Sequence, residues 1–241
     1  MSDKAQPVPA VLGIALVGAE STGKTALAQA LAVRLAADTG RRVAWVPELL
    51  RDWCESQGRT PLAHEQAAIL RGQHERIDAA AATHDIVVCD TTALMTAVYS
   101  GLVFGDHSMD ERAALLHRRC AQLTLLMALD LPWVADGLQR DGPHVRAPVD
   151  AALRLLMQRH HIDHAVIGGS GPARLDAALA AVAPLLRDRH DRHDRFDGGD
   201  RRNSAAPRLH LPGAAGRKPR WSCACCLPNE EPARRPLGAP E

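Results

Sequence analysis

The chain has 241 residues, 46% of them hydrophobic, which is enough to bury the core of one substantial domain. Its 29 Lys and Arg nearly balance its 28 Asp and Glu, so net charge gives no reason to expect binding to nucleic acid or an anionic membrane. Six irregularly spaced cysteines, no signal peptide and no apolar run near the ~18 residues of a membrane span predict a cytoplasmic protein.

The first predicted elements flank a glycine-rich loop. A near-continuous apolar run at 11–17 predicts a buried parallel strand. The loop GAESTGKT follows at 18–25, and leucines recurring every four residues then predict a helix at 26–38. Gly40 is placed to end that helix.

The later elements alternate in the same way. Strands are predicted at 41–47, 85–90, 123–129 and 163–169, and helices at 48–58, 62–83, 92–101, 109–120, 151–160 and 172–186. This alternation predicts an α/β fold, a parallel sheet of five strands with helices on both faces. The segment 133–148, polar and broken by Gly and Pro, is suited to a mobile lid.

The composition changes near residue 187. Beyond it the chain has no apolar periodicity and is dense in Arg, Asp, His, Gly and Pro. We therefore expect a flexible N-terminus at 1–10, one domain at 11–186 and a disordered tail at 187–241. Acids are interleaved with the arginines of the tail and would repel phosphate, so the tail is not expected to bind nucleic acid.

The octapeptide at 18–25 matches the phosphate-binding pattern G-x-x-x-x-G-K-[ST] without a gap. Glycines let such a loop curl so that successive N–H groups point at phosphate oxygens, and the helix N-terminus adds its dipole. Lys24 is expected to reach the β- and γ-phosphates, and the Thr25 hydroxyl to ligate Mg²⁺. The residues predicted to bind ATP are Gly18, Ala19, Glu20, Ser21, Thr22, Gly23, Lys24 and Thr25.

Asp90 ends the third predicted strand, in IVVCD. Ligands of open α/β sheets bind at the carboxyl ends of the strands, so this acid is expected beside the phosphate loop. There it could hold Mg²⁺ or take the proton of an attacking hydroxyl. The alternative is an N-cap for the helix that starts near Thr92.

Other charged residues follow the second and fourth strands. Glu48 and Arg51 are three apart on a predicted helix and would share a face, either over the neighbouring strand end or as a surface ion pair. Arg140 and Arg146 lie in the lid segment, where arginines can close over developing charge or simply stay solvated. Residues 73–75, Gln-His-Glu, are expected at the surface of a helix.

Five motifs occur in a fixed order: G-x-E-S-T-G-K-T, E-x-x-R-D, G-Q-H-E, C-D-T-T and P-W-V-x-D-G-L. In this pattern, over about residues 11–186, the chain resembles the ribosylnicotinamide kinase domain of NadR-type proteins and their stand-alone P-loop relatives. The resemblance implies a P-loop NTPase three-layer fold, similar to nucleoside and nucleotide monophosphate kinases. It also implies ATP–Mg²⁺ as donor and the 5′-hydroxyl of nicotinamide riboside as acceptor, which gives nicotinamide mononucleotide.

The resemblance also implies roles for individual residues. Those it assigns to catalysis are Lys24, Asp90, Glu48 and Arg140, and those it assigns to the acceptor are Glu48, Arg51, Trp133 and Asp136. Trp133 would lie against a cationic pyridinium or pack within the lid. Two positions depart from the family pattern: Gln139 stands where an arginine is common, with Arg140 one position later, and Leu49 replaces a tyrosine.

The sequence leaves several alternatives open. A rival interpretation is a P-loop ATPase that acts as a nucleotide-dependent switch for a partner, without a small-molecule acceptor. Nothing resembles the H-x-G-H of an adenylyltransferase or a DNA-binding segment. The identity of the acceptor, the choice of base between Asp90 and Glu48, and the oligomeric state are not determined.

Overall fold

Five short apolar strands form one parallel sheet in the computed structural model, which describes residues 11–134 and 142–197. The strands are β1 (Leu12–Val17), β2 (Val43–Val46), β3 (Ile86–Asp90), β4 (Leu123–Met127) and β5 (Ala165–Ile167), in the order β2-β3-β1-β4-β5. β1 lies at the centre and pairs in parallel with β3 and β4. The predicted five-stranded parallel sheet is confirmed.

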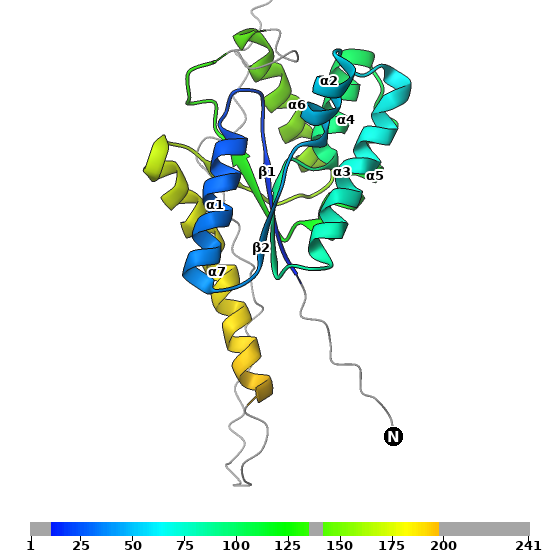
Figure 1. Cartoon of the computed structure of the whole chain (residues 1–241). Helices are drawn as coiled ribbons and strands as arrows, with labels where there is room; N and C mark the ends of the chain where they lie inside the picture. The colour runs from blue at the N-terminus through cyan, green and yellow to red at the C-terminus, as the bar shows by residue number, and fades with distance from the viewer. Residues whose placement is uncertain (1–10, 135–141, 198–241) are drawn as a thin grey trace, which may run out of the picture. The chain divides into compact units, whose positions relative to one another are not determined.

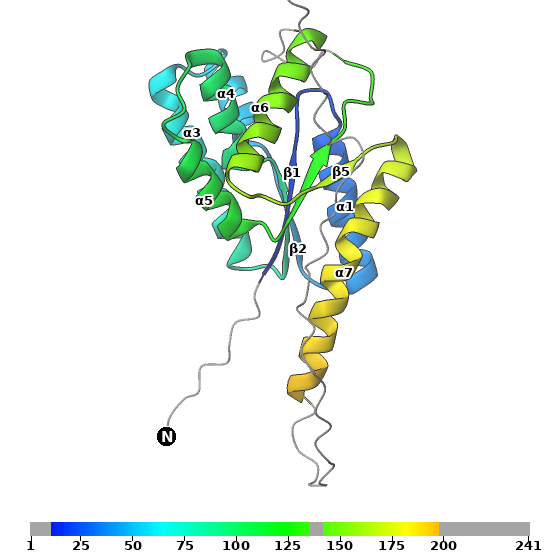
Figure 2. The same ribbon diagram turned by 180° about the vertical axis from the view of Figure 1, so that it is seen from behind.

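Helices cover both faces of the sheet, so the described part of the chain has three layers (Figures 1 and 2). The helices are α1 (Lys24–Thr39), α2 (Leu49–Gln57), α3 (Gln66–Ala81), α4 (Ala93–Phe104), α5 (Asp110–Cys120), α6 (Arg146–Arg159) and α7 (Gly171–Asp197). Two single 3₁₀ turns, η1 (Ala63–Glu65) and η2 (Pro143–Val145), precede α3 and α6. α1 and α7 lie on one face, and α3, α4, α5 and α6 on the other.

Two apolar clusters explain why the central strands read as continuous hydrophobic runs. Side chains alternate between the faces of a strand, and every residue of β1 is buried. Leu12, Ile14 and Leu16 pack with α1 and α7, whereas Val17 packs in the cluster that α4, α5 and α6 cover. A strand buried on both faces has no polar positions to alternate with.

The ends of several helices follow the expected rules. Gly40 ends α1 in the left-handed conformation (φ 64°), as predicted, with its N–H bonded to the carbonyl of Ala36. α6 begins at Arg146, earlier than the predicted residue 151, because Pro148 lies in its first turn, where a missing N–H loses no helical bond. It therefore takes in the end of the predicted lid segment.

α7 continues past the predicted end at residue 186 to Asp197. The stretch 187–197 is charged but contains no Gly or Pro, so nothing in its backbone chemistry breaks a helix before Gly198. The predicted N-terminal segment 1–10 and residues 198–241 of the predicted tail lie outside the described residues. Among the described helices, none combines the length and the apolar character that crossing a bilayer requires.

Candidate active site

The phosphate loop joins β1 to α1 and depends on backbone conformations that favour glycine. Gly18 has φ 149°, and a Cβ there would come within 3.0 Å of the Met127 side chain on β4. Gly23 precedes α1 in the left-handed conformation, with φ 78°. Ser21, at the tip, also has a positive φ of 53°. The loop therefore curls as the motif predicts.

Side chains of the loop bond to its own backbone and to the segment after β4. The Thr22 hydroxyl and the Lys24 ammonium both donate to the carbonyl of Ala19, at 2.8 and 2.7 Å. The Ser21 hydroxyl donates to the Val134 carbonyl at 3.1 Å and accepts from the Val134 N–H at 2.8 Å. The start of the predicted lid segment is thus attached to the tip of the phosphate loop.

Asp90 lies beside the loop, as predicted for an acid at the end of β3. It is 1% exposed, and its Oδ1 has no hydrogen-bond partner among the described residues. Burial raises the pKa of this carboxyl, while a hydrogen bond from the Thr25 hydroxyl and the charges of Lys24 and Arg51 lower it. The structure therefore brings together residues from three separate motifs: Lys24 and Thr25 of the octapeptide, Arg51 and Asp90.

The alternative role for Asp90, as a helix cap, is not what the structure has. Thr92 is the N-cap of α4, and its hydroxyl accepts from the Leu94 N–H at 3.4 Å. Between them, Thr91 has φ 73°, a left-handed conformation that costs a non-glycine residue roughly 1 kcal/mol or more. Its N–H still pairs with the Leu16 carbonyl at 3.1 Å. The chain turns sharply here, immediately after the buried acid.

The E-x-x-R element lies at the start of α2. Glu48 is the N-cap residue of this helix, with φ −66° and ψ 115°. Arg51 lies in the first turn of α2, and its charge acts on Asp90. The structure therefore places the charge of Arg51 near the buried acid at the end of β3.

Gln73 and His74, expected at the surface of a helix, are buried instead. The carboxamide of Gln73, on α3, accepts from the Leu49 N–H at 2.7 Å and donates to the Pro47 carbonyl at 3.4 Å. It therefore pairs with the backbone on both sides of Glu48. The expectation was wrong for these two residues because α3 packs against both α2 and α4, and it holds for Glu75, which is exposed on the same helix.

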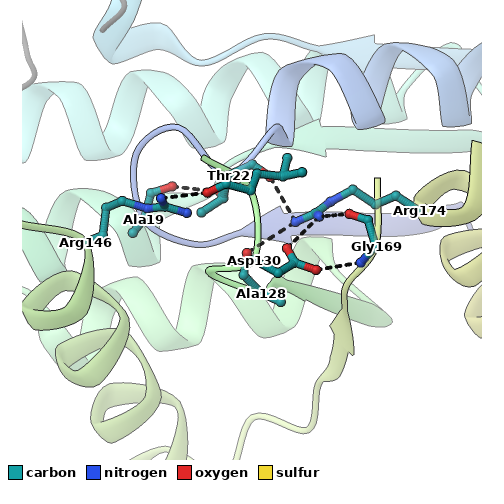
Figure 3. Close-up of polar contacts among 8 residues, drawn as sticks. Ala19, Thr22, Ala128, Asp130, Arg146, Gly169 and Arg174 are labelled. Carbon is teal, nitrogen blue, oxygen red and sulfur yellow. Dashed lines mark hydrogen bonds and ion pairs between the residues drawn. The ribbon is translucent and has the colours of Figure 1, made fainter. Parts of the chain in front are cut away.

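Arg146 enters the site from the start of α6. It is 8% exposed, and one nitrogen donates to the Leu131 carbonyl at 2.8 Å. Leu131 is itself in contact with the loop, since a Cβ on Gly23 would come within 3.1 Å of its side chain. The Nε and Nη2 of Arg146 are buried without partners among the described residues. Figure 3 shows Arg146 extending from its helix toward the phosphate loop.

Arg174, on α7, is a site residue that sequence reasoning missed. It is 4% exposed, forms an ion pair with Asp130 at 2.8 Å, and donates to three backbone carbonyls (Figure 3). The carbonyls belong to Thr22 at 3.1 Å, Ala128 at 3.2 Å and Gly169. Burial raises the pKa of Asp130, but Arg174 and the Gly169 N–H outweigh it, so the net shift is downward. No motif or spacing marks this arginine.

Four further predicted residues remain to be placed. Glu20 turns away from the curl of the loop toward α4, where its Oε1 accepts from the Tyr99 hydroxyl at 2.8 Å. The indole N–H of Trp133 is buried without a partner in the described part of the chain. Asp136 and Arg140 lie outside the described residues.

Solved structures of kinase-like proteins share this fold. They include the NadR protein in complex with NR (20% identity, TM-score 0.56) and in complex with NAD and AMP-PNP (19% identity, TM-score 0.57). Each match covers 73% of this chain and 50% or 49% of the NadR chain, so this chain spans about half the length of those proteins. Thymidylate kinase from Ehrlichia chaffeensis matches over 73% of this chain and 100% of its own (18% identity, TM-score 0.52).

At these identities the solved structures establish the fold, and the predicted P-loop NTPase fold with kinase-like neighbours is confirmed. No curated protein matches the chain significantly. A protein-family model described as an AAA domain matches residues 13–174, from β1 to the start of α7. This match covers more than half of the chain, which therefore belongs to that family of P-loop AAA domains.

Proposed function

We propose that the protein is an ATP-dependent phosphotransferase that phosphorylates a hydroxyl of a small molecule, with the 5′-hydroxyl of nicotinamide riboside as the expected acceptor. One observation carries the proposal: the buried carboxyl of Asp90 lies with Thr25, Lys24 and Arg51 at the carboxyl end of the sheet. Phosphoryl transfer needs such an acid beside a phosphate cradle. The fold likeness to NadR bound to NR supports the choice of acceptor.

The chemical step needs no covalent intermediate on the protein. A bond forms between the acceptor hydroxyl oxygen and the γ-phosphorus while the bond from that phosphorus to the β–γ bridging oxygen breaks. The bridging oxygen keeps the electron pair and leaves on ADP. The hydroxyl proton passes to a carboxylate, either Asp90 or Glu48. Burial raises the pKa of Asp90, which makes it a better proton acceptor than an ordinary aspartate.

Positive side chains would stabilise the charge that develops on the transferred group. Lys24 belongs to the loop itself, and Arg51 acts on the same carboxyl. Arg146 is the lid arginine we favour, because two of its buried nitrogens have no partner among the described residues. An arginine in this position can bond to phosphate oxygens through both nitrogens.

Mg²⁺ is the expected cofactor, and the residues present fit it. The buried Oδ1 of Asp90 and the hydroxyl of Thr25 are oxygen ligands of the kind that Mg²⁺ prefers. When bound, the ion neutralises charge on the β- and γ-phosphates. We assign Thr25 and Asp90 to holding it, Asp90 either directly or through water.

The test is an ADP-release assay with Mg-ATP and nicotinamide riboside, ordinary ribonucleosides or no acceptor. We expect nicotinamide riboside to stimulate release. We expect Lys24→Ala and Arg146→Gln each to lower kcat by about 10²–10³-fold, because each removes a donor to the transferred phosphoryl group. Arg34→Ala, which removes an exposed ion pair on α1, is the matched control and should keep full activity. Full turnover in Lys24→Ala would sink the assignment.

A second candidate follows from the family description, since an AAA domain is also compatible with an ATPase that switches a partner protein. The same assay separates the two functions. Slow ADP release that is equal with and without every acceptor, and that still depends on Lys24, would favour the switch.

A further inference from the structure

Glu20 is an acidic residue inside a loop that otherwise suits an anion. It occupies the third position of the octapeptide, yet it is 9% exposed and its side chain bonds to Tyr99 on α4. A carboxylate repels phosphate, so this side chain is poorly suited to the cradle formed by the backbone around it. Its direction, toward α4, separates it from the phosphate-facing part of the loop.

The carboxyl of Glu20 is half satisfied. Its Oε1 accepts from the Tyr99 hydroxyl at 2.8 Å, while its Oε2 is buried and has no partner among the described residues. A buried oxygen left unpaired costs about 1–3 kcal/mol, so such an atom calls for an explanation. Because a carboxylate oxygen only accepts, the missing partner is a hydrogen-bond donor.

The position of α4 indicates on which side of the loop that donor lies. α4 starts directly after Asp90 and Thr92, and its residues pack in the same apolar cluster as Ala19 of the loop. α1 and α7, by contrast, cover the opposite face of the sheet (Figures 1 and 2). Glu20 therefore lies on the side of the loop where α4 begins after Asp90. An acceptor that reaches Asp90 must approach from this side.

We propose that Glu20 is a specificity-determining residue that binds a sugar hydroxyl of the acceptor, other than the hydroxyl that is phosphorylated, and so selects ribosides over deoxyribosides. The proposal rests on the kinase function proposed above. Tyr99 holds one carboxylate oxygen and thereby orients the other toward the sugar. A hydroxyl is a donor of the same kind as the one Tyr99 supplies.

The experiment measures kcat/KM of the full chain for one riboside acceptor and for its 2′-deoxy and 3′-deoxy forms. In the wild type we expect kcat/KM for one of the two deoxy forms to be about 10–100-fold lower than for the riboside, which is the effect of losing one hydrogen bond to a charged group. In Glu20→Gln, kcat/KM for the riboside should fall toward the value for that deoxy form. The value of kcat/KM for the deoxy form itself should stay unchanged. The Kd for an ATP analogue should stay within about twofold, which a general loosening of the loop would not allow.

Two further variants serve as a control and as an independent test of the same contact. Glu111→Gln changes an exposed acid on α5 and should keep the wild-type preference. Tyr99→Phe leaves the carboxylate but removes its anchor, and it should lower the preference partially even if Glu20→Gln folds poorly.

The possible failures are distinguishable. A wild type that phosphorylates no acceptor overturns the kinase function and this proposal together. A wild type that phosphorylates riboside and both deoxy forms equally well, or a Glu20→Gln variant that slows all three acceptors alike, overturns only the assignment of Glu20. A loss of ATP-analogue affinity without any change in preference would return Glu20 to the nucleotide side of the loop.

Discussion

At Asp90, burial raises the carboxyl pKa while Thr25, Lys24 and Arg51 act in the opposite direction. These opposing effects suit the role proposed for Asp90, which is to be charged when it holds a metal ion and basic enough to accept a proton. Gln73 holds the backbone on both sides of Glu48. Its carboxamide bonds to the backbone at Pro47 and Leu49.

Replacing Gln73 by alanine removes both of these hydrogen bonds. If Gln73 positions Glu48, we expect the KM for the acceptor to rise about tenfold, equivalent to roughly 1.4 kcal/mol, with little change in the Kd for an ATP analogue. Gln73→Glu keeps an oxygen for the Leu49 N–H and should recover part of the loss. Glu75→Gln, two residues along the same helix and exposed, is the control. An unchanged acceptor KM with a lower Tm would mean a purely structural role.

Between elements, the phosphate loop is held from the side of α7. Arg174 connects the carbonyl of Thr22 in the loop to Ala128 after β4 and to Gly169 after β5, and its charge pairs with Asp130. These bonds and the ion pair offset part of the cost of burying the guanidinium, whose Nε has no partner among the described residues. The sheet brings the phosphate loop and the segments after β4 and β5 near one another, and the side chain of Arg174 connects the three by hydrogen bonds.

Arg174→Met keeps the length of the side chain but leaves these carbonyls unpaired. We expect the free energy of unfolding to fall by roughly 2–3 kcal/mol, because hydrogen bonds from a charged group are lost in a buried place. Asp130 is 38% exposed and can turn to water, so the loss should stay below that for a fully buried ion pair. Urea denaturation measures it. Arg34→Met, in an exposed pair on α1, should change stability by less than about 0.5 kcal/mol, and an equal effect of both variants would contradict the argument.

At the scale of the whole molecule, a buried histidine joins the helical layer to the sheet. His117 on α5 is 1% exposed and bonds to the hydroxyls of Thr92 at 2.9 Å and Thr124 on β4 at 2.8 Å. Burial, with a smaller contribution from Arg118, lowers its pKa from 6.5 to about 4. The fold therefore favours the neutral imidazole, which can donate to one threonine and accept from the other.

This shift makes stability depend on pH. Below pH 6.5 the unfolded chain takes up a proton that the folded chain accepts only near pH 4. The contribution of His117 is complete above the higher value and is lost as pH falls between the two, by roughly 3 kcal/mol. Urea denaturation at pH 7.5 and pH 4.5 should show that His117→Gln weakens this dependence, whereas exposed His107→Gln leaves it unchanged. The same pH dependence in His117→Gln and the wild type would contradict the shift.

Much of the fold and the centre of the candidate site follow from local sequence patterns. Apolar runs determine where the strands lie, because a strand covered on both faces admits only hydrophobic residues. The pattern from Gly18 to Thr25 predicts the curled loop, since its glycines adopt conformations that other residues avoid. Asp90 could be assigned to the site because parallel strands end at the same edge of a sheet.

Only the tertiary structure decided which distant groups these residues meet. The bond from Tyr99 to Glu20 spans 79 residues of sequence, and the bond from Arg174 to Thr22 spans 152. The sequence predicts a surface position for Gln73, but the packing of α2 and α4 against α3 buries it. Periodicity identifies which face of an element is buried, but a polar side chain on that face finds its partner through the packing of whole elements, which no local spacing encodes.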